Sequence, residues 1–276
     1  MILADILRDK GIDCFAAIRV DACAVGNERL HSQLPCDTYA IFMLFPYYVS
    51  ERNSRLATFA AVPDYHIFGR ELFSLLEGYI TEKYGVFARG YTDHSPLEER
   101  DGAARCGLGI IGRHGLLISE KYSSFVCIGE LICALSEEQL REEGVEVRSK
   151  EIGYCDGCGI CIRKCPGRCA DGDKSLCISA ITQKKGELTE AEADAVYSSG
   201  SVWGCDVCQL SCPHTERAMK AGTMETKIPY FYENVITGDE SDIEALRDED
   251  YKKYTFSYRK RNVMQRNIDI VRRDKK

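Results

Sequence analysis

The chain has few prolines, no long apolar run and no export signal. Seven prolines among 276 residues, with 45% apolar and 29% charged residues, are typical of a globular protein and exclude a proline-rich disordered chain. No apolar run approaches the roughly 20 residues that a membrane-spanning helix needs. The first ten residues alternate charged and apolar side chains, and they lack a basic n-region and a twin-arginine signal. We therefore expect a cytoplasmic protein with no membrane partner.

Cysteine is abundant instead, and eight of the 15 cysteines form two blocks. The first block is Cys155-x2-Cys158-x2-Cys161-x3-Cys165-Pro166, and the second is Cys177 followed by Cys205-x2-Cys208-x3-Cys212-Pro213. A C-x2-C-x2-C loop wraps three thiolates around one [4Fe–4S] cluster, and the next cysteine reaches the other cluster of a pair. We therefore predict two [4Fe–4S] clusters, one on Cys155, Cys158, Cys161 and Cys212, the other on Cys165, Cys177, Cys205 and Cys208.

Zinc and disulfides are the competing interpretations of these blocks. A zinc pair could use C-x2-C units but has no ready use for the longer run. Disulfides are disfavoured by the close spacing and by a reducing cytosol. The surplus cysteines lie mostly among apolar residues, where a free thiol acts as a small hydrophobe: Cys14, Cys23, Cys36, Cys106, Cys127, Cys133 and Cys169. Cys169 follows Cys165 closely enough to lie near a cluster, but we expect it not to be a ligand.

Charge is unevenly spread along the chain. The net charge of −7 disfavours nucleic-acid binding over the whole surface. Residues 137–151 carry six glutamates against three basic residues, which is typical of a solvated connector. Residues 256–276 carry eight Lys or Arg against two Asp, which is either a local phosphate-binding surface or simply a solvated helix face.

Apolar periodicity predicts strands over 39–45, 85–91, 116–118 and 125–135. It predicts helices over 1–10, 65–84, 97–106, 242–251 and 257–273. The pattern indicates an α/β domain with a mixed sheet and flanking helices over residues 1–150. A ferredoxin-like α+β module of mostly short helices would hold both clusters over 151–220. A helical tail over 221–276 would pack back on the first domain.

Several stretches, in order along the chain, resemble the epoxyqueuosine reductase family, which is related to reductive dehalogenases. They are Asp64-Tyr-His66, Thr92-Asp-His-Ser-Pro-Leu-Glu-Glu-Arg100, Ala104-Arg-Cys-Gly-Leu-Gly-Ile-Ile-Gly112, Ile128-Gly-Glu-Leu-Ile132, Cys177-Ile-Ser179 and Gly204-Cys-Asp-Val-Cys-Gln209. The resemblance implies a cytoplasmic reductase with two [4Fe–4S] clusters and cobalamin, which would carry the difficult chemistry. It also implies a low-potential donor of flavodoxin or ferredoxin type, a monomer, and a modified tRNA base carrying an epoxide as substrate.

The resemblance places cobalamin beside one set of residues in the α/β domain: Asp64, Tyr65, His66, Gly107, Gly109, Gly112 and Arg113. It makes Asp93 the catalytic proton donor, which would require a raised pKa. Taken without the resemblance, Asp93 could simply cap the helix that begins near Pro96. Gly107 could equally end that helix. In the resembled family cobalt has no histidine ligand, so His66 would line the pocket or be a satisfied polar residue.

The chain departs from the family in three places. It would be a short form that lacks the C-terminal helical-repeat domain, which helps to hold tRNA. Gly109-Ile-Ile-Gly-Arg113 replaces the usual Gly-Trp-Ile-Gly-Lys, and Pro166-Gly-Arg-Cys169 replaces the usual Pro-Thr-Gly-Ala. These departures leave open a related substrate other than a tRNA base. Two alternative functions also stay open: a two-cluster electron-transfer protein without cobalamin, and a cytoplasmic enzyme similar to reductive dehalogenases.

Overall fold

The computed structural model describes residues 1–167, 169 and 175–273. The strands are β1 (Phe15–Arg19), β2 (Tyr39–Pro46), β3 (Ala88–Tyr91), β4 (Ile110–Ile111), β5 (Leu117–Ile118) and β6 (Val126–Cys133). The α-helices are α1 (Leu3–Asp9), α2 (Glu28–His31), α3 (Thr58–Ala61), α4 (Tyr65–Tyr84), α5 (Glu99–Arg105), α6 (Glu137–Glu142), α7 (Ile160–Lys164), α8 (Ile178–Thr182), α9 (Glu190–Ser199), α10 (Val207–Leu210), α11 (Pro213–Lys220), α12 (Pro229–Tyr232), α13 (Glu240–Ala245), α14 (Asp248–Tyr251) and α15 (Arg261–Val271). Two 3-10 turns are η1 (Val20–Ala22) and η2 (Thr255–Tyr258).

The central sheet has the strand order β1-β2-β6-β3, and its three strand pairings are all antiparallel. β2 is buried along its whole length, because its side chains alternate between two cores. Ile41, Met43 and Phe45 face one core, whereas Phe42 and Leu44 face the other. A strand that is covered on both faces has a continuous run of apolar residues. β2 therefore confirms the strand predicted over 39–45.

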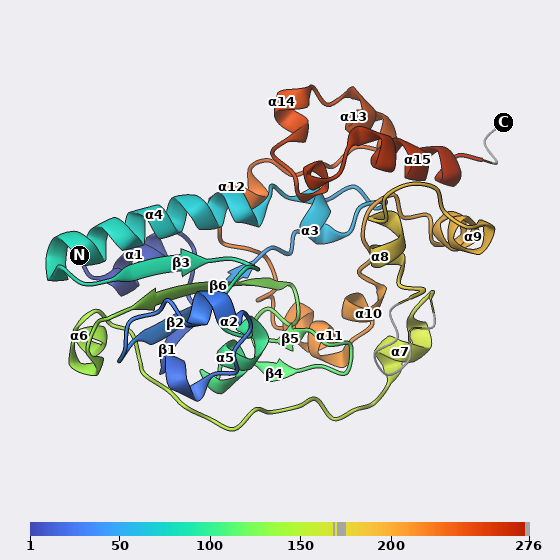
Figure 1. Ribbon diagram of the computed structural model, residues 1–276. Helices are drawn as coiled ribbons and strands as arrows, with labels where there is room; N and C mark the ends of the chain where they lie inside the picture. The colour runs from blue at the N-terminus through green and yellow to red at the C-terminus, as the bar shows by residue number, and fades with distance from the viewer. Residues whose placement is uncertain (168, 170–174, 274–276) are drawn as a thin grey trace.

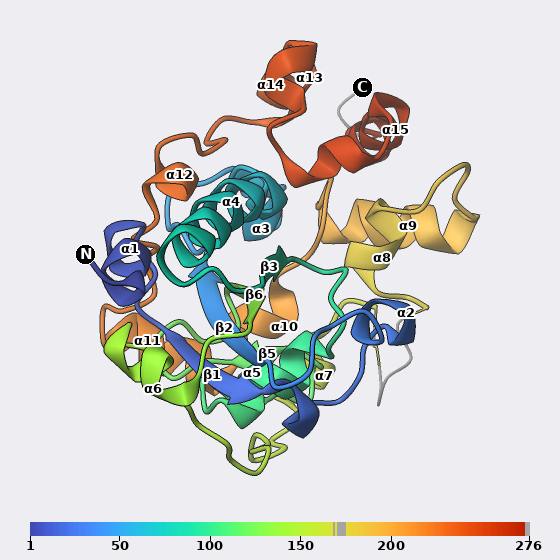
Figure 2. The ribbon, with the colours of Figure 1, turned by 60° about the vertical axis from the view of Figure 1, so that its left-hand side comes forward.

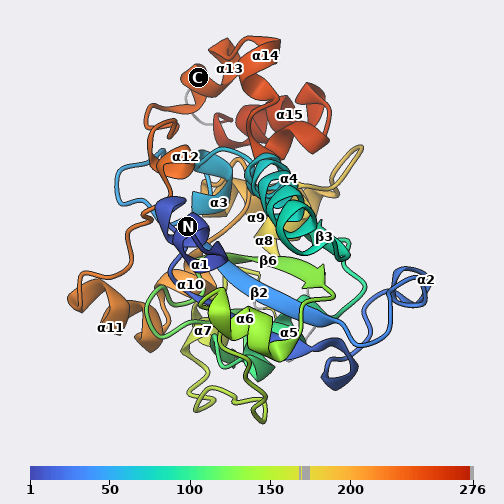
Figure 3. The same cartoon turned by 90° about the vertical axis from the view of Figure 1, so that its left-hand side faces the viewer.

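Two helices cover opposite faces of this sheet, α4 on one and α5 on the other (Figures 1 and 3). α4 coincides with the helix predicted over 65–84, and its Leu72, Phe73 and Leu76 pack on the sheet. α5 approaches the other face closely, because a Cβ on Gly102 would lie 2.1 Å from the ring of Phe42. This close packing fixes the position of the loop between β3 and α5.

The expected α/β character is confirmed, but the sheet is antiparallel rather than mixed. Parallel pairing occurs only as isolated bridges among the described residues, such as that of Ala17 with Val147. Between residues 151 and 220 the described elements are the helices α7 to α11, without a named strand. The ferredoxin-like module therefore stays a prediction.

The C-terminal third joins both earlier parts of the chain. Phe231 of α12 packs in the core that α4 covers. Trp203, Phe256 and Ile268 share a second core with Leu56 and with helices α8 and α9. Figure 2 shows α15 beside α9, above α8. The three-part division of the sequence stays a prediction, since this core crosses its boundaries.

The acidic stretch 137–151 is not wholly the solvated connector that its composition predicts. Glu143 is fully buried, and its carboxylate accepts hydrogen bonds from Tyr79, Lys83, Tyr84 and the backbone N–H of Leu3. It thereby ties α1 to the C-terminal half of α4. In the part of the chain that the structure describes, no helix is long and apolar enough to cross a membrane.

Candidate active site and cysteine groups

Asp93 lies in the loop between β3 and α5, in an unusual backbone conformation. Its φ of 66° is in the left-handed region, which costs most residues energy but which Asp tolerates better than most. The backbone N–H of Asp93 donates to Oε1 of Glu99 at 2.7 Å. Since Glu99 is the first residue of α5, the helix that packs on Phe42 also holds this turn in place.

The Asp93 carboxylate faces the start of α4. Its Oδ2 accepts a hydrogen bond from the Tyr65 hydroxyl at 2.6 Å and lies 2.9 Å from Nε2 of His66. Asp64, the N-cap of α4, accepts from the His66 backbone N–H at 2.9 Å and lies 2.7 Å from its Nδ1. The imidazole is thus held between two carboxylates, with Tyr65 stacked on it at 4.2 Å between ring centroids.

This geometry answers the question of whether Asp93 is a helix cap. The N-cap of α5 is Glu98, without a side-chain capping bond. The Asp93 side chain points instead to Tyr65 and His66. Asp64, Tyr65, His66 and Asp93 therefore lie together in the structure; that they form a cobalamin and catalytic site stays a prediction.

The raised pKa that a role of Asp93 as the acid would require is not found in this structure. Burial by itself would raise it, but hydrogen bonds from His66 and Tyr65 outweigh burial and leave the pKa below its ordinary value. The hydrogen bond to Asp64, reinforced by the bond to Asp93, raises the pKa of His66 to about 9. At neutral pH the proton therefore resides on His66, and Asp93 is ionised.

Two further carboxyl groups near this loop were not found from the sequence. Burial, together with the charge of Asp93, raises the pKa of Glu99 to about 7. Glu130 on β6 is fully buried, accepts from the Ser95 hydroxyl, and has its pKa raised to about 8 by burial. A glutamate inside the predicted buried strand 125–135 was the available signal for Glu130. Both groups can hold a proton near neutral pH.

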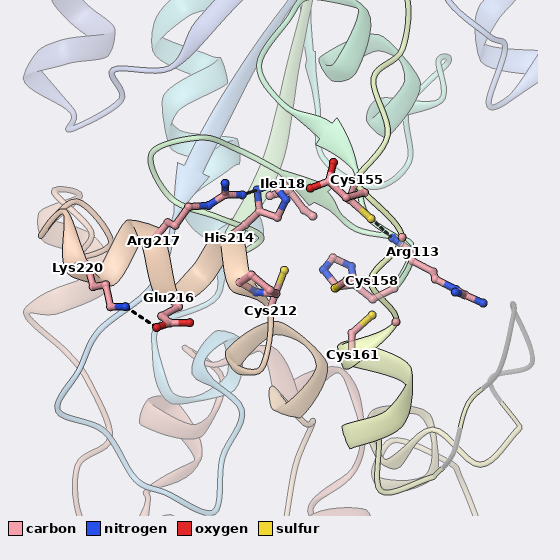
Figure 4. Close-up of a pocket in the computed structure, with 15 residues that line it drawn as sticks. Arg113, Ile118, Cys155, Cys158, Cys161, Cys212, His214, Glu216, Arg217 and Lys220 are labelled. Atoms are coloured by element: carbon pink, nitrogen blue, oxygen red, sulfur yellow. Dashed lines mark hydrogen bonds and ion pairs between the residues drawn. The ribbon is translucent and has the colours of Figure 1, made fainter.

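The first cysteine group lines a cavity of about 260 Å³. Figure 4 shows the sulfur atoms of Cys155, Cys158, Cys161 and Cys212 directed toward this cavity from the loop before α7, from α7 and from the start of α11. The backbone N–H of Arg113 donates to the Cys155 sulfur at 3.3 Å. Burial, with the neighbouring thiols of the same group, raises the pKa of Cys161.

The second group consists of Cys165, Cys177, Cys205 and Cys208. Cys177 is the N-cap of α8, and Cys208 lies on α10. Burial, followed by the nearby thiols of Cys205, Cys177 and Cys165, raises the pKa of Cys208 to about 12. Cys169 lies against Cys165 and Cys177, and burial and these two contacts raise its pKa.

Each group contains the exchanged cysteine that the sequence assigns to it, Cys212 in the first and Cys165 in the second. Among the described residues, no three Cys, His, Asp or Glu side chains are gathered as for a single metal ion. A cluster spreads its thiolates over separate irons, so four convergent thiols fit its donor set. That they bind clusters stays a prediction.

The remaining predicted cofactor residues lie apart from Asp93. Gly107 follows the end of α5 with φ of 73°, as a helix-terminating glycine does. A Cβ on Gly109 would lie 2.5 Å from the carbonyl oxygen of Ile118 on β5, so packing alone explains this glycine. Both line a separate cavity of about 970 Å³. Gly112 is packed against His114, and Arg113 lines the cavity of the first cysteine group.

The basic C-terminal residues are largely occupied within the protein. Arg266 donates to the carbonyl oxygens of Lys184 and Gly186, and Asn267 donates to those of Thr182 and Val202. Arg259 donates to the carbonyl oxygen of Gln183. These side chains satisfy backbone carbonyls near the ends of α8 and α9, and Arg261 and Arg272 pair with carboxylates of α13 and α14. Four of the eight cations counted in this segment are thus bound within the protein, which weakens its interpretation as a phosphate-binding surface.

The chain is similar to known proteins over most of its length. It is 32% identical over 177 residues to an epoxyqueuosine reductase from Gloeobacter violaceus, covering 62% of this chain and 52% of that protein. It is 29% identical over 264 residues to the Cellulophaga algicola epoxyqueuosine reductase, covering 89% and 81%. The chain spans about half the length of the first curated relatives that it matches. No family model matches it.

Solved structures share the fold. Epoxyqueuosine reductase from Streptococcus thermophilus and an epoxyqueuosine reductase holding a modified tRNA stem loop each give a TM-score of 0.70 at 20% identity, covering 98% of this chain and 80% of theirs. A catabolic reductive dehalogenase gives 0.51 at 17% identity, covering 82% and 34%. The resemblance that the motifs indicate is confirmed by the sequence matches, and the solved structures show the shared fold.

Proposed function

We propose that this chain, which is similar to epoxyqueuosine reductases, is an oxidoreductase that removes an epoxide oxygen with the help of two [4Fe–4S] clusters and cobalamin. Loss of an epoxide oxygen as water takes two electrons and two protons and leaves a carbon–carbon double bond. The cysteine groups would carry the electrons on their clusters, and the Asp93 site would deliver the protons. The observation that carries the proposal is that both kinds of site occur in one fold.

The cofactors have residues suited to them. The two cysteine groups, each of four thiols, would hold the clusters, in the ferredoxin-like arrangement that the spacing predicts. Tyr65, His66 and Asp93 would line one wall of the cobalamin site. When bound, cobalamin would supply a strongly reducing metal centre. The Asp93 carboxylate is 48% exposed, so it can reach a neighbouring substrate.

The proton chemistry follows from the hydrogen bonds. His66 holds a proton on Nε2, 2.9 Å from Oδ2 of Asp93, and Asp64 supports the charge from Nδ1. Asp93 can pass this proton to the oxygen of an opening epoxide, where negative charge develops. The pair would then take up a second proton from solvent and donate it to the same oxygen, which leaves as water. Since the pKa of His66 is raised to about 9, the Asp93–His66 pair carries a proton at neutral pH although the pKa of Asp93 is not raised.

The substrate would be a modified base in tRNA, because a similar structure holds an epoxyqueuosine-modified tRNA stem loop. The low-potential donor would be a flavodoxin or ferredoxin, and the enzyme would act as a monomer. A related small substrate is the alternative. Activity on a free nucleoside that does not change with salt would favour it, since phosphate contacts make RNA binding steeply salt-dependent.

The first experiment separates a reductase from an electron carrier. The anaerobically reconstituted protein should contain about eight iron atoms and two EPR-active clusters. Cob(II)alamin added to it should form a complex with altered EPR and absorbance. Asp93→Asn should retain clusters and complex but lose turnover. Intact clusters without any cobalamin complex would instead favour the electron carrier, for which the Asp93–His66 pair has no use.

A further inference from the structure

The surface around the first cysteine group carries a charge opposite to that of the whole chain. Five basic residues surround its cavity and the adjoining helix α7, and we call them the basic rim: Arg113, Arg163, Lys164, Arg217 and Lys220. Two acidic residues, Asp156 and Glu216, lie among them. The net charge of the whole chain is −7. A local excess of positive charge on an acidic protein attracts acidic partners.

Two of these cations are held directly over the cysteine loop. Arg163 donates from Nη1 to the carbonyl oxygen of Cys158 at 3.0 Å. A Cβ on Gly159 would lie 3.1 Å from Nη1 of Arg163 and 3.7 Å from Nη1 of Arg113. The two guanidinium groups therefore lie close together beside Cys158.

The first group also opens toward solvent. Cys158 is exposed, and Tyr154 beside Cys155 is 70% exposed, although it is a large aromatic residue. Figure 4 shows Lys220 of α11 and Arg113 on opposite sides of the four sulfur atoms. Lys220 is paired with Glu216, and both are at the surface. A redox centre with an exposed cysteine and an exposed aromatic residue is accessible to a partner protein.

The second group is connected to the Asp93 site through the side chains that lie between them. Gln209, next to Cys208, accepts a hydrogen bond from the buried Tyr47 at the end of β2, at 3.3 Å. Cys127 on β6 lies near both Tyr47 and Tyr65. Burial is the largest cause of the raised pKa of these two tyrosines, and the nearby Cys127 is the next. Close contacts thus lead from Cys208 to the Asp93 site, whereas Cys158, the one exposed cysteine among the eight, belongs to the first group.

We propose that the basic rim is the docking surface for a small acidic electron-carrier protein. The proposal rests on the proposed function, since it assigns the entry point of that reaction's electrons. In each encounter the carrier loses one electron and the first cluster gains it, and two encounters supply the two electrons that one turnover consumes. Such encounters use small, transient interfaces, in which charge mainly sets the association rate.

The test uses charge reversal at two outer positions of the rim. The double variant Lys164→Glu, Lys220→Glu leaves the arginines over the cysteine loop unchanged. The matched control is Lys10→Glu, Lys252→Glu, which changes the net charge equally. These two lysines are exposed and follow α1 and α14, on other sides of the molecule from α7 (Figure 1). Iron content should be the same in all three proteins.

Cluster reduction is followed by stopped-flow absorbance, with reduced flavodoxin as the acidic carrier and with dithionite as a small reductant. At low salt the rim variant should be reduced by flavodoxin about tenfold more slowly or worse, as loss of electrostatic steering implies. Near 1 M salt, where charges are screened within about 3 Å, the difference should vanish. The control and the dithionite rates should stay within about twofold of the unaltered protein.

Two results would overturn the proposal without affecting the proposed function. One is a flavodoxin rate equal in the rim variant and the control. The other is an equal slowing with dithionite, which would mean that the lysines tune the cluster rather than bind a carrier. If the unaltered protein holds no reducible cluster, the proposed function itself fails. The dithionite measurement distinguishes these failures.

Discussion

Replacing Asp93 with asparagine should lower the pKa of His66 as well as turnover. Two carboxylates support the imidazolium, Asp64 at 2.7 Å and Asp93 at 2.9 Å, and together they raise its pKa from 6.5 to about 9 against the opposing effect of burial. Asp64 is the larger cause. Loss of the Asp93 charge should therefore lower the pKa by about one unit, within the range for one nearby carboxylate.

The measurement is an NMR titration of the histidine ring signals of oxidised protein, with His66→Gln identifying the resonance among five histidines. Asp64→Asn should lower the same pKa further than Asp93→Asn does. Turnover of Asp93→Asn should fall by about 10²–10⁴, the usual contribution of a positioned acid. An unchanged pKa of His66 in Asp93→Asn would refute the pairing, and near-normal turnover would refute proton delivery by Asp93.

Three other perturbations test separate parts of the structure. Cys165→Ala should damage the cluster of Cys177, Cys205 and Cys208, and EPR showing loss of the other cluster would contradict the exchanged assignment. Glu99→Ala should displace the turn that holds Asp93 and so lower turnover by about tenfold or more. Glu99→Gln keeps a hydrogen-bond acceptor and should lower turnover less. Equal losses in the two variants would argue against a role of Glu99 in positioning Asp93. For Glu143, burial would raise the pKa, but its hydrogen bonds outweigh burial and lower it below 4.5, so its stabilisation is present above that pH and lost as the pH falls. Glu143→Gln should therefore cost about 1–3 kcal/mol in urea unfolding at pH 7 and much less at pH 3, and a pH-independent cost would contradict this.

The local sequence was sufficient to predict a feature of the structure wherever a single helix, strand or loop determines that feature. The apolar run at 39–45 is buried on both faces, and the helix over 65–84 is bounded by Asp64 as N-cap and Gly85 in the left-handed conformation. The cysteine spacing also predicted which side chains would meet, including the two exchanged ones. In each case short-range geometry limited the arrangement to very few alternatives.

Interactions between segments that are distant in the sequence could not be predicted from the local sequence. The short strand β1 was missed, because its five residues form a strand only by pairing with β2. Glu143 looked like part of a solvated acidic run until Tyr79 and Lys83 were placed beside it. The two donors that face the Asp93 carboxylate and lower its pKa could not be predicted either, since they come from the start of α4.

The hydrogen bonds from Arg266 and Asn267 to the backbone at the end of α8 and after it have a consequence for how firmly the second cysteine group is held. Cys177 begins α8, while the carbonyl groups at the other end of that helix are satisfied by side chains of α15. α15 contributes no cysteine, but the helix that carries Cys177 is thus supported by a much later part of the chain. Chains that end before α15 should therefore retain iron less firmly in the second group than in the first.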